Sequence, residues 1–246
     1  VFEVAIRPHL VPELDRRWPP LGLASHAEQP PGPVVARIGL SDRWVIVPDV
    51  EESGDDPPLL AWDQLEQSLT VFTAHRLARL VAVHAAAFAW DGKAVIVPAS
   101  SGGGKSTLTV AAAKAGATVL TDEYALLDGS TGWVTGWHRA VRLLRDDGGV
   151  DRLHLAEAHA PMPVGLVAMV SHVPGGPSLF TRISPSEVVG RILEHTLCSR
   201  DRPVEAFEAA VAVARAASAV SGNRGEAAGA VTELRTLLEQ GVAGQS

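Results

Sequence analysis

The sequence predicts an α/β fold with a mixed sheet, and three observations carry this expectation. A glycine-rich loop, residues 99–107, separates an apolar, strand-like run from a helix-like segment. The dipeptide Asp91-Gly92 joins that run to an earlier apolar segment, which is typical of an antiparallel hairpin because both turn positions favour positive φ. Alanine-rich amphipathic segments at 203–220 and 226–240 predict helices that pack on the sheet. We therefore expect a hairpin that leads into the loop, with flanking helices.

The bulk composition is that of a folded domain. Of the 246 residues, 46% are hydrophobic and 20% are charged, and the net charge of −7 argues against a nucleic-acid partner, which usually requires a basic face. No run of about 18 apolar residues predicts a membrane-spanning helix, and no signal peptide is recognised at the N-terminus. The single cysteine, Cys198, cannot form an internal disulfide. These features predict a cytoplasmic protein without a membrane partner.

The first part of the chain, residues 1–60, predicts strands and irregular loops that pack on a larger domain of residues 61–246. Val34–Ile38 and Trp44–Val47 are short runs of strand-forming residues. The spacing of leucines over residues 60–80 predicts a helix. We expect the larger domain to hold the glycine-rich loop and the C-terminal helices.

The next elements are expected in close succession. Val81–Trp90 and Lys93–Val97 predict the two strands of the hairpin, because each is a nearly continuous apolar run. A helix is expected from about Lys105 to Lys114, with Gly116 placed to end it in a left-handed conformation. Thr118–Leu120 then predicts a short buried strand.

Three further signals extend the prediction toward the C-terminus. Tyr124–Leu127 and Trp133–Trp137 predict a second hairpin. Leu166–Val170 predicts a buried strand. The sequence Ser184-Pro-Ser-Glu187 predicts a helix start, because a serine cap, an early proline and a glutamate three residues after the cap favour that position.

The loop of residues 99–107 matches the pattern G-x-x-x-x-G-K-[ST], except that Ala99 replaces the first glycine. Its glycines let backbone N–H groups turn toward a phosphate, and the helix that follows directs its positive end to the same place. Lys105 can neutralise the β- and γ-phosphates, and the Ser106 hydroxyl can bind Mg²⁺. The loop therefore predicts ATP and Mg²⁺ as cofactors. The residues expected to contact the nucleotide are Ser100, Ser101, Gly102, Gly103, Gly104, Lys105, Ser106 and Thr107.

Two adjacent carboxylates, Asp122 and Glu123, follow the strand after the predicted helix. Such a pair behind a phosphate loop suits Mg²⁺ binding and removal of a proton from a hydroxyl group. A GTPase of the translational type is not expected, because its Asn-Lys-x-Asp motif is missing: the only asparagine, Asn223, is followed by Arg224.

The segment from His84 to Asp128 resembles the catalytic domain of HPr kinase/phosphorylase and its kinase-like relatives, which share a histidine, a phosphate loop and an acid pair in this order. The resemblance implies a P-loop kinase fold of the HPr kinase / PEP carboxykinase type, and it also implies a homo-oligomer. It assigns the active site residue by residue: His84, Lys105 and Asp122 as catalytic residues, and Glu123, helped by Asp122, as the proton acceptor. Ser106 and Asp122 are expected to bind Mg²⁺.

The chain departs from this family at two places. Glu123 stands where the family has aspartate, and Trp137–Arg142 occupies the place of a signature in which a Mg²⁺-binding glutamate precedes Arg-Gly. The chain thus looks like shorter, divergent relatives, some of which phosphorylate precursor peptides of natural products. The expected function is transfer of the ATP γ-phosphate to a hydroxyl, such as a serine of a peptide, protein or lasso-type precursor. A kinase of a small hydroxyl metabolite and a non-catalytic ATP-binding regulatory module are the alternatives.

Overall fold

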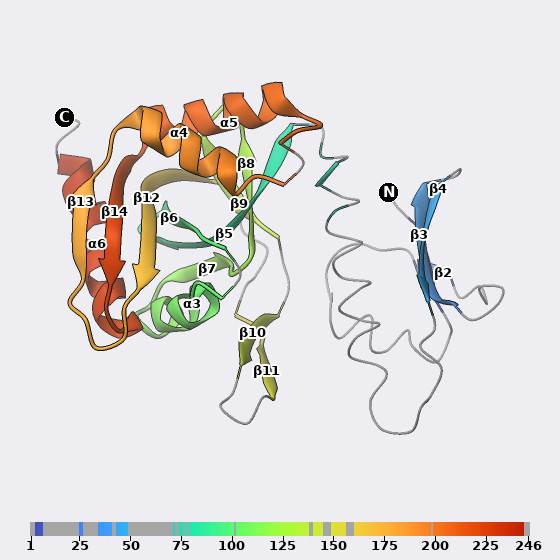
Figure 1. Ribbon diagram of the computed structural model, residues 1–246, viewed down its shortest axis with the longest axis horizontal. Helices are drawn as coiled ribbons and strands as arrows, with labels where there is room; N and C mark the ends of the chain where they lie inside the picture. The colour runs from blue at the N-terminus through green and yellow to red at the C-terminus, as the bar shows by residue number, and fades with distance from the viewer. Residues whose placement is uncertain are drawn as a thin grey trace. The chain divides into compact units, whose positions relative to one another are not determined.

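The computed structural model describes residues 3–6, 25–26, 34–40, 43–48, 71, 74–75, 77, 79–100, 102–137, 140–144, 149–155, 160–197 and 199–243. The chain forms two compact units, Val1–Arg76 and Leu77–Ser246 (Figure 1). None of the described helices is long and apolar enough to cross a membrane.

The first unit contains a four-stranded sheet in the order β2-β1-β3-β4. Its strands are β1 Glu3–Ile6, β2 Ser25–His26, β3 Val34–Leu40 and β4 Arg43–Pro48. The antiparallel pairing of β3 with β4 confirms the two strands predicted in this region. Most of the helix predicted over residues 60–80 lies outside the described residues. Its last residue, Leu80, begins a strand, so the predicted helix extends too far.

The second unit is built on an eight-stranded mixed sheet in the order β13-β14-β12-β6-β5-β8-β9, with β7 paired to β5. Its strands are β5 Leu80–Trp90, β6 Lys93–Pro98, β7 Thr118–Thr121, β8 Tyr124–Asp128, β9 Trp133–Gly136, β12 Met162–His172, β13 Leu179–Arg182 and β14 Ser218–Arg224. The strands β6, β12 and β14 run parallel, whereas β5 is antiparallel to β6, β7 and β8. A separate ribbon consists of β10 Val141–Leu144 and β11 Val150–Leu153. The predicted mixed sheet is therefore confirmed.

The hairpin of β5 and β6 lies in the middle of this sheet and turns at Asp91-Gly92. Both residues have positive φ, 49° and 73°, as this type of two-residue turn requires. Ala85 and Ala86 point to opposite faces of β5, yet both are fully buried. The sequence of β5 is continuously apolar because both faces of this strand are buried, whereas a strand with one solvent-exposed face would alternate apolar and polar residues.

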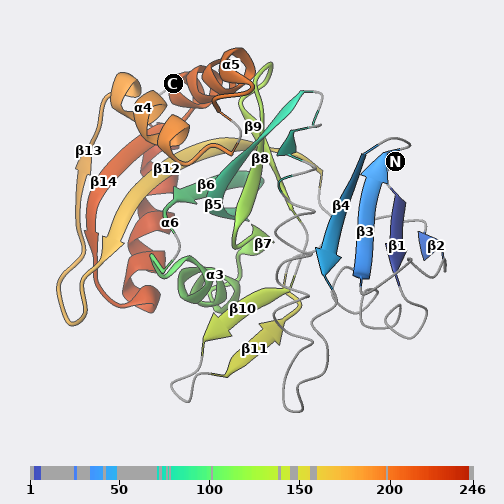
Figure 2. The same ribbon diagram turned by 45° about the vertical axis from the view of Figure 1, so that its right-hand side comes forward.

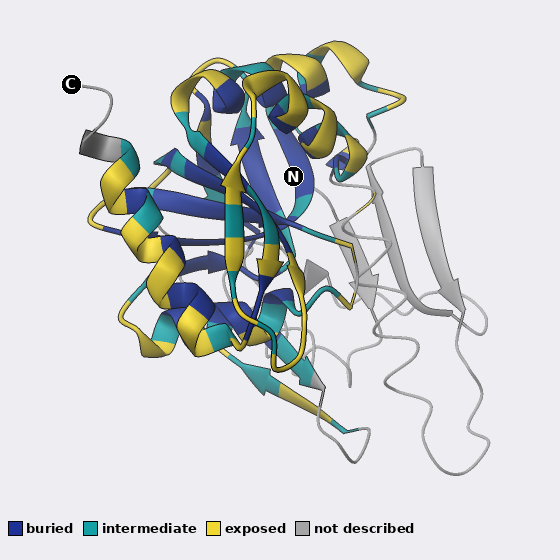
Figure 3. Ribbon diagram, turned by 60° about the vertical axis from the view of Figure 1, so that its left-hand side comes forward, coloured by how far each residue is buried: buried dark blue, intermediate teal, exposed yellow. Residues whose placement is uncertain are grey.

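The helices form one layer on each face of the sheet. Their bounds are α3 Lys105–Lys114, α4 Pro185–Glu194, α5 Pro203–Ala216 and α6 Ala227–Ala243. Ala85 and Ala87 share a core with α4 and α5, while Ala86 and Phe88 share the opposite core with α3 and α6. Figure 2 shows α4 and α5 side by side, and Figure 3 shows the buried strands between the two layers.

Local signals place the ends of two helices correctly. Gly116 has φ 79°, and the N–H groups of Gly116 and Ala117 donate to the carbonyls of Ala113 and Ala112, which closes α3. Ser184 accepts a hydrogen bond from the Glu187 N–H at 3.3 Å and begins α4. Both predicted helix ends are confirmed.

The predicted helix over residues 203–220 is wrong in its last part. The helix α5 ends at Ala216, and Ser218–Arg224 forms β14, which pairs in parallel with β12. Helix propensity favours the alanines before this point, but sheet pairing and burial of Ala219 and Val220 determine the strand after it. The second predicted helix, 226–240, is confirmed as α6.

Candidate phosphate site and acid pair

The glycine-rich loop connects the end of β6, at Pro98, to the start of α3, at Lys105. Gly102 and Gly104 have φ of 80° and 75°, a conformation that favours glycine. The Gly103 N–H donates to the Ser100 carbonyl at 3.2 Å and tightens the loop. The predicted contact residue Ser101 lies outside the described residues. The loop therefore has the sharp turns that bring backbone close to a ligand.

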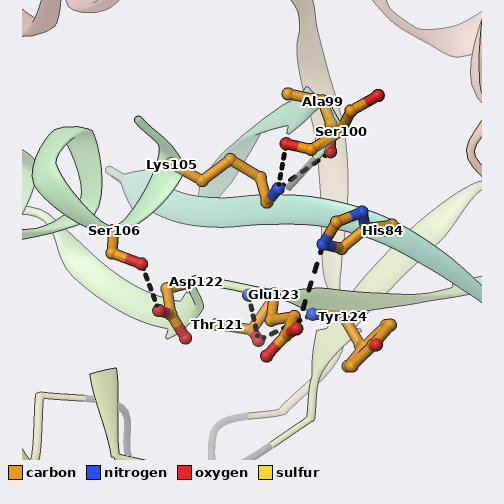
Figure 4. A network of polar contacts seen from close by, with 9 residues as sticks. All are labelled: His84, Ala99, Ser100, Lys105, Ser106, Thr121, Asp122, Glu123 and Tyr124. Carbon is orange, nitrogen blue, oxygen red and sulfur yellow. Dashed lines mark hydrogen bonds and ion pairs between the residues drawn. The ribbon is translucent and has the colours of Figure 1, made fainter. Parts of the chain in front are cut away.

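Lys105 and Ser106 leave the start of α3 in two directions (Figure 4). The Lys105 Nζ atom donates to the carbonyls of Ala99 at 2.8 Å and Ser100 at 3.0 Å, and the residue is only 7% exposed. The Ser106 Oγ atom donates to Asp122 Oδ2 at 2.7 Å, and Asp122 is 2% exposed. The ammonium group thus lies along the loop, and the hydroxyl lies against a buried carboxylate.

The oxygen atoms of Ser106 and Asp122 are of the kind that binds Mg²⁺. A hydroxyl and a carboxylate are hard oxygen ligands, the kind that Mg²⁺ prefers, and this ion usually takes few protein ligands together with phosphate oxygens.

His84 and Glu123 lie beside each other where β5 passes the loop. His84 Nε2 is 3.9 Å from Glu123 Oε1, and both side chains are partly exposed, at 21% and 25%. The His84 ring also contacts the Tyr124 ring, with centroids 5.6 Å apart. The His84 carbonyl accepts a hydrogen bond from the Ala99 N–H, and the next residue, Ala85, donates to the Glu123 carbonyl. The strand β5 therefore holds the loop and the acid pair at neighbouring points.

Thr121 fixes the backbone of the acid pair and was not predicted as a site residue. Its buried Oγ1 accepts hydrogen bonds from the N–H groups of Glu123 and Tyr124, both at 3.2 Å. The same hydroxyl donates to the Trp137 carbonyl at 3.2 Å. A threonine two residues before Glu123 is the sequence signal for such a turn, because its hydroxyl can bond the backbone locally.

Replacing Thr121 with Val is expected to lower the free energy of unfolding by about 1–3 kcal/mol, because two partly buried N–H groups and one carbonyl lose this partner. Replacing it with Ser should retain most of the stability, since the hydroxyl remains. Urea unfolding of the three proteins measures the difference. Equal stability of the Val variant and the wild type would contradict the assigned network.

A cavity of 760 Å³ adjoins the loop. It lies at the carboxyl ends of the parallel strands β6, β12 and β14, the edge at which α/β sheets usually bind ligands. Its wall includes Ala99, Gly103, His172, Arg191, His195 and Asn223. Arg191 and His195 are not predicted from the sequence, because α4 and the residue after it lie beside the loop only once the sheet is folded.

His195 makes the stability of the protein sensitive to acid. Burial lowers its pKa below the ordinary value of 6.5, the neighbouring Lys105 and Arg191 lower it further, and Glu194 raises it. As the pH falls through about 6.5, the unfolded chain takes up a proton that the folded chain resists, so unfolding becomes more favourable.

We therefore expect the melting temperature of the wild type to fall more between pH 7.5 and pH 5.5 than that of His195→Gln, which has no titrating group at this position. Melting curves in buffers of equal ionic strength test this expectation. A variant that is as acid-sensitive as the wild type would show that His195 makes no contribution.

Of the segment Trp137–Arg142, in which the chain departs from the family it resembles, residues 138–139 lie outside the described residues, and Arg142 lies in β10. The described site thus brings together His84, Lys105, Ser106, Asp122 and Glu123 where the loop after β6 lies beside β5.

Comparison with known proteins gives no sequence relative. No family model matches the chain, and no curated protein matches it. Among solved structures, the Hpr(Ser) kinase/phosphatase from Coxiella burnetii is similar over 66% of this chain and 94% of its own, with 14% sequence identity and a TM-score of 0.36. The function proposed below rests on the geometry of the site and not on this likeness.

Proposed function

We propose that this chain binds ATP with Mg²⁺ and transfers the γ-phosphoryl group to a hydroxyl of an acceptor. The observation that carries the proposal is the convergence of two pairs at one place: Ser106 with Asp122 beside the loop, and His84 with Glu123 on the neighbouring strands. The first pair suits a phosphate-bound cation, and the second offers a carboxylate as a proton acceptor.

The loop and the start of α3 would bind the phosphates of ATP. Backbone N–H groups and the positive end of the helix attract the anion. Lys105 would exchange its bonds to the Ala99 and Ser100 carbonyls for bonds to phosphate oxygens and would offset their charge. Ser106 and Asp122 would hold Mg²⁺, which would supply further charge stabilisation for the transferring group.

Glu123 would take the proton of the acceptor hydroxyl while its oxygen attacks the γ-phosphorus. The new O–P bond forms as the bond to the β–γ bridging oxygen breaks, so ADP leaves with the bonding electron pair. The proton stays on Glu123 and passes to solvent after release. His84, 3.9 Å from Glu123 Oε1, would orient this carboxyl group.

The acceptor class that we propose is a serine of a peptide or protein, with a precursor peptide of a natural product as one form. The cavity of 760 Å³ beside the loop also favours a small hydroxyl compound, because it offers space for one at the ends of β6, β12 and β14. A cytoplasmic location and assembly into a homo-oligomer stay predictions.

The test is incubation of the chain with γ-labelled ATP, Mg²⁺ and two sets of acceptors: serine-containing peptides and small hydroxyl compounds. A labelled acceptor supports the proposal and identifies the class. Tight ADP binding without transfer to any acceptor would contradict the kinase reaction and support a nucleotide-binding regulatory module.

A further inference from the structure

Arg224 reaches the glycine-rich loop from the far end of the chain. It is the last residue of β14 and is 2% exposed. Its Nη2 atom donates to the Gly104 carbonyl at 3.3 Å, and its Nη1 atom donates to the Gly225 carbonyl at 3.1 Å. The Gly104 carbonyl also accepts the Leu108 N–H at 3.0 Å, the first hydrogen bond of α3. The guanidinium group therefore holds the residue at which the helix begins.

Arg224 contacts Gly104 closely enough that a side chain there would displace the guanidinium group. A Cβ atom on this glycine would overlap Arg224 Nη2, and the φ of 75° disfavours other residues there as well. The loop and the arginine are thus fitted to each other, although 120 positions separate them in the sequence.

The charge of Arg224 has little compensation. Burial lowers its pKa, and the nearby Glu226 raises it, but an arginine keeps its proton in proteins. Among the residues that the structure describes, no carboxylate lies within ion-pair distance of its guanidinium group. The Glu226 side chain is 75% exposed and pairs with His172 at 3.8 Å. A buried cation without a carboxylate partner is costly.

A second buried cation, Lys105, lies at the same end of α3, whose first turn contains no acidic residue. The N-terminus of a helix is itself positive, so cations there are unfavourable unless an anion is bound. The arrangement favours a multiply charged anion at the loop.

We propose that Arg224 is a positioning residue of the phosphate site. It fixes the Gly104 carbonyl so that the loop keeps its N–H groups toward the phosphates, and it adds buried positive charge that raises the affinity for a polyphosphate. The inference rests on the proposed function, since it requires the loop to bind phosphates, but it does not depend on transfer.

The experiment is calorimetric titration with pyrophosphate and with ADP at fixed ionic strength. Arg224→Met is expected to weaken the affinities for pyrophosphate and ADP about tenfold. Arg224→Lys keeps the charge but not the two-nitrogen fork, so it should weaken these affinities less than about threefold. Arg215→Met is the matched control, because it removes one exposed charge from α5 in the same unit. It should leave both affinities unchanged.

Melting temperatures without ligand separate this role from a purely structural one. Arg224→Met should melt no lower than the wild type, since the variant loses an uncompensated buried charge. A lower melting temperature together with wild-type affinity for pyrophosphate would overturn the inference. If Arg224→Met does not fold, Arg224→Gln is used in its place: a tenfold loss of pyrophosphate affinity supports the inference, and wild-type affinity overturns it. Failure of the wild type to bind either probe would instead refute the proposed function.

Discussion

Replacing Glu123 with Gln is expected to slow phosphoryl transfer by about 10²–10⁴-fold while leaving ADP affinity within about twofold of the wild type. Glutamine has nearly the shape of glutamate but cannot accept the proton of the acceptor hydroxyl. The side chain lies beside His84, at 3.9 Å, and away from the carbonyls that hold Lys105. Binding and transfer should therefore respond differently to this single change.

Two comparisons make the result specific. Glu123→Asp keeps the carboxylate but withdraws it by one methylene group, so we expect a rate between those of the wild type and Glu123→Gln. Glu233→Gln, an exposed change on α6, is the matched control and should have no effect. Rates are measured with the acceptor identified by the labelling experiment. An unchanged rate in Glu123→Gln would show that another group takes the proton.

Much of the second unit could be predicted because its signals are local. Asp91-Gly92 specifies its turn through two positive φ angles, and Gly116 and Ser184 specify helix ends through hydrogen bonds to residues close in sequence. Each of these signals needs only a few neighbouring residues, so it can be read without knowing the fold.

The strand β14 could not be predicted for the opposite reason. Ala219 and Val220 continue the apolar pattern of α5, and only pairing of β14 with β12 along its whole length makes the extended conformation favourable. Because the helix was predicted to extend to residue 220, Arg224 was expected in the segment after a helix and not in contact with the glycine-rich loop. Thr121 and His195 were also missed, since their contacts involve carbonyls and charges that become neighbours only in the folded sheet.

The proximity of His84, Lys105 and Glu123 was expected, and the hairpin explains why. The turn at Asp91-Gly92 sends β6 back along β5, so the loop after β6 returns to His84. The strand β7 then pairs with the other edge of β5 and delivers the acid pair to the same place. A short stretch of sequence thus builds the core of the site, and distant segments complete it.

Replacing Lys105 with Met is expected to weaken ADP binding about 100-fold, because a charge-assisted hydrogen bond to phosphate contributes about 1.5–3 kcal/mol. Without ligand, Lys105 bonds to two loop carbonyls in a nearly closed environment. Methionine has similar length and is apolar, so it can fill this space, while removal of the buried charge offsets the lost hydrogen bonds. The melting temperature without ligand should therefore change by no more than about 4 °C.

Lys114→Met provides the matched control for this prediction. It makes the same chemical change on the same helix, but at the exposed C-terminal end of α3, away from the loop. A cation there interacts favourably with the helix dipole, so the control should lose a little stability and no ADP affinity. Calorimetric titration with ADP, with melting curves of both variants, gives the comparison. If Lys105→Met bound ADP as tightly as the wild type, the loop would not be the phosphate site, and the kinase proposal would fail with it.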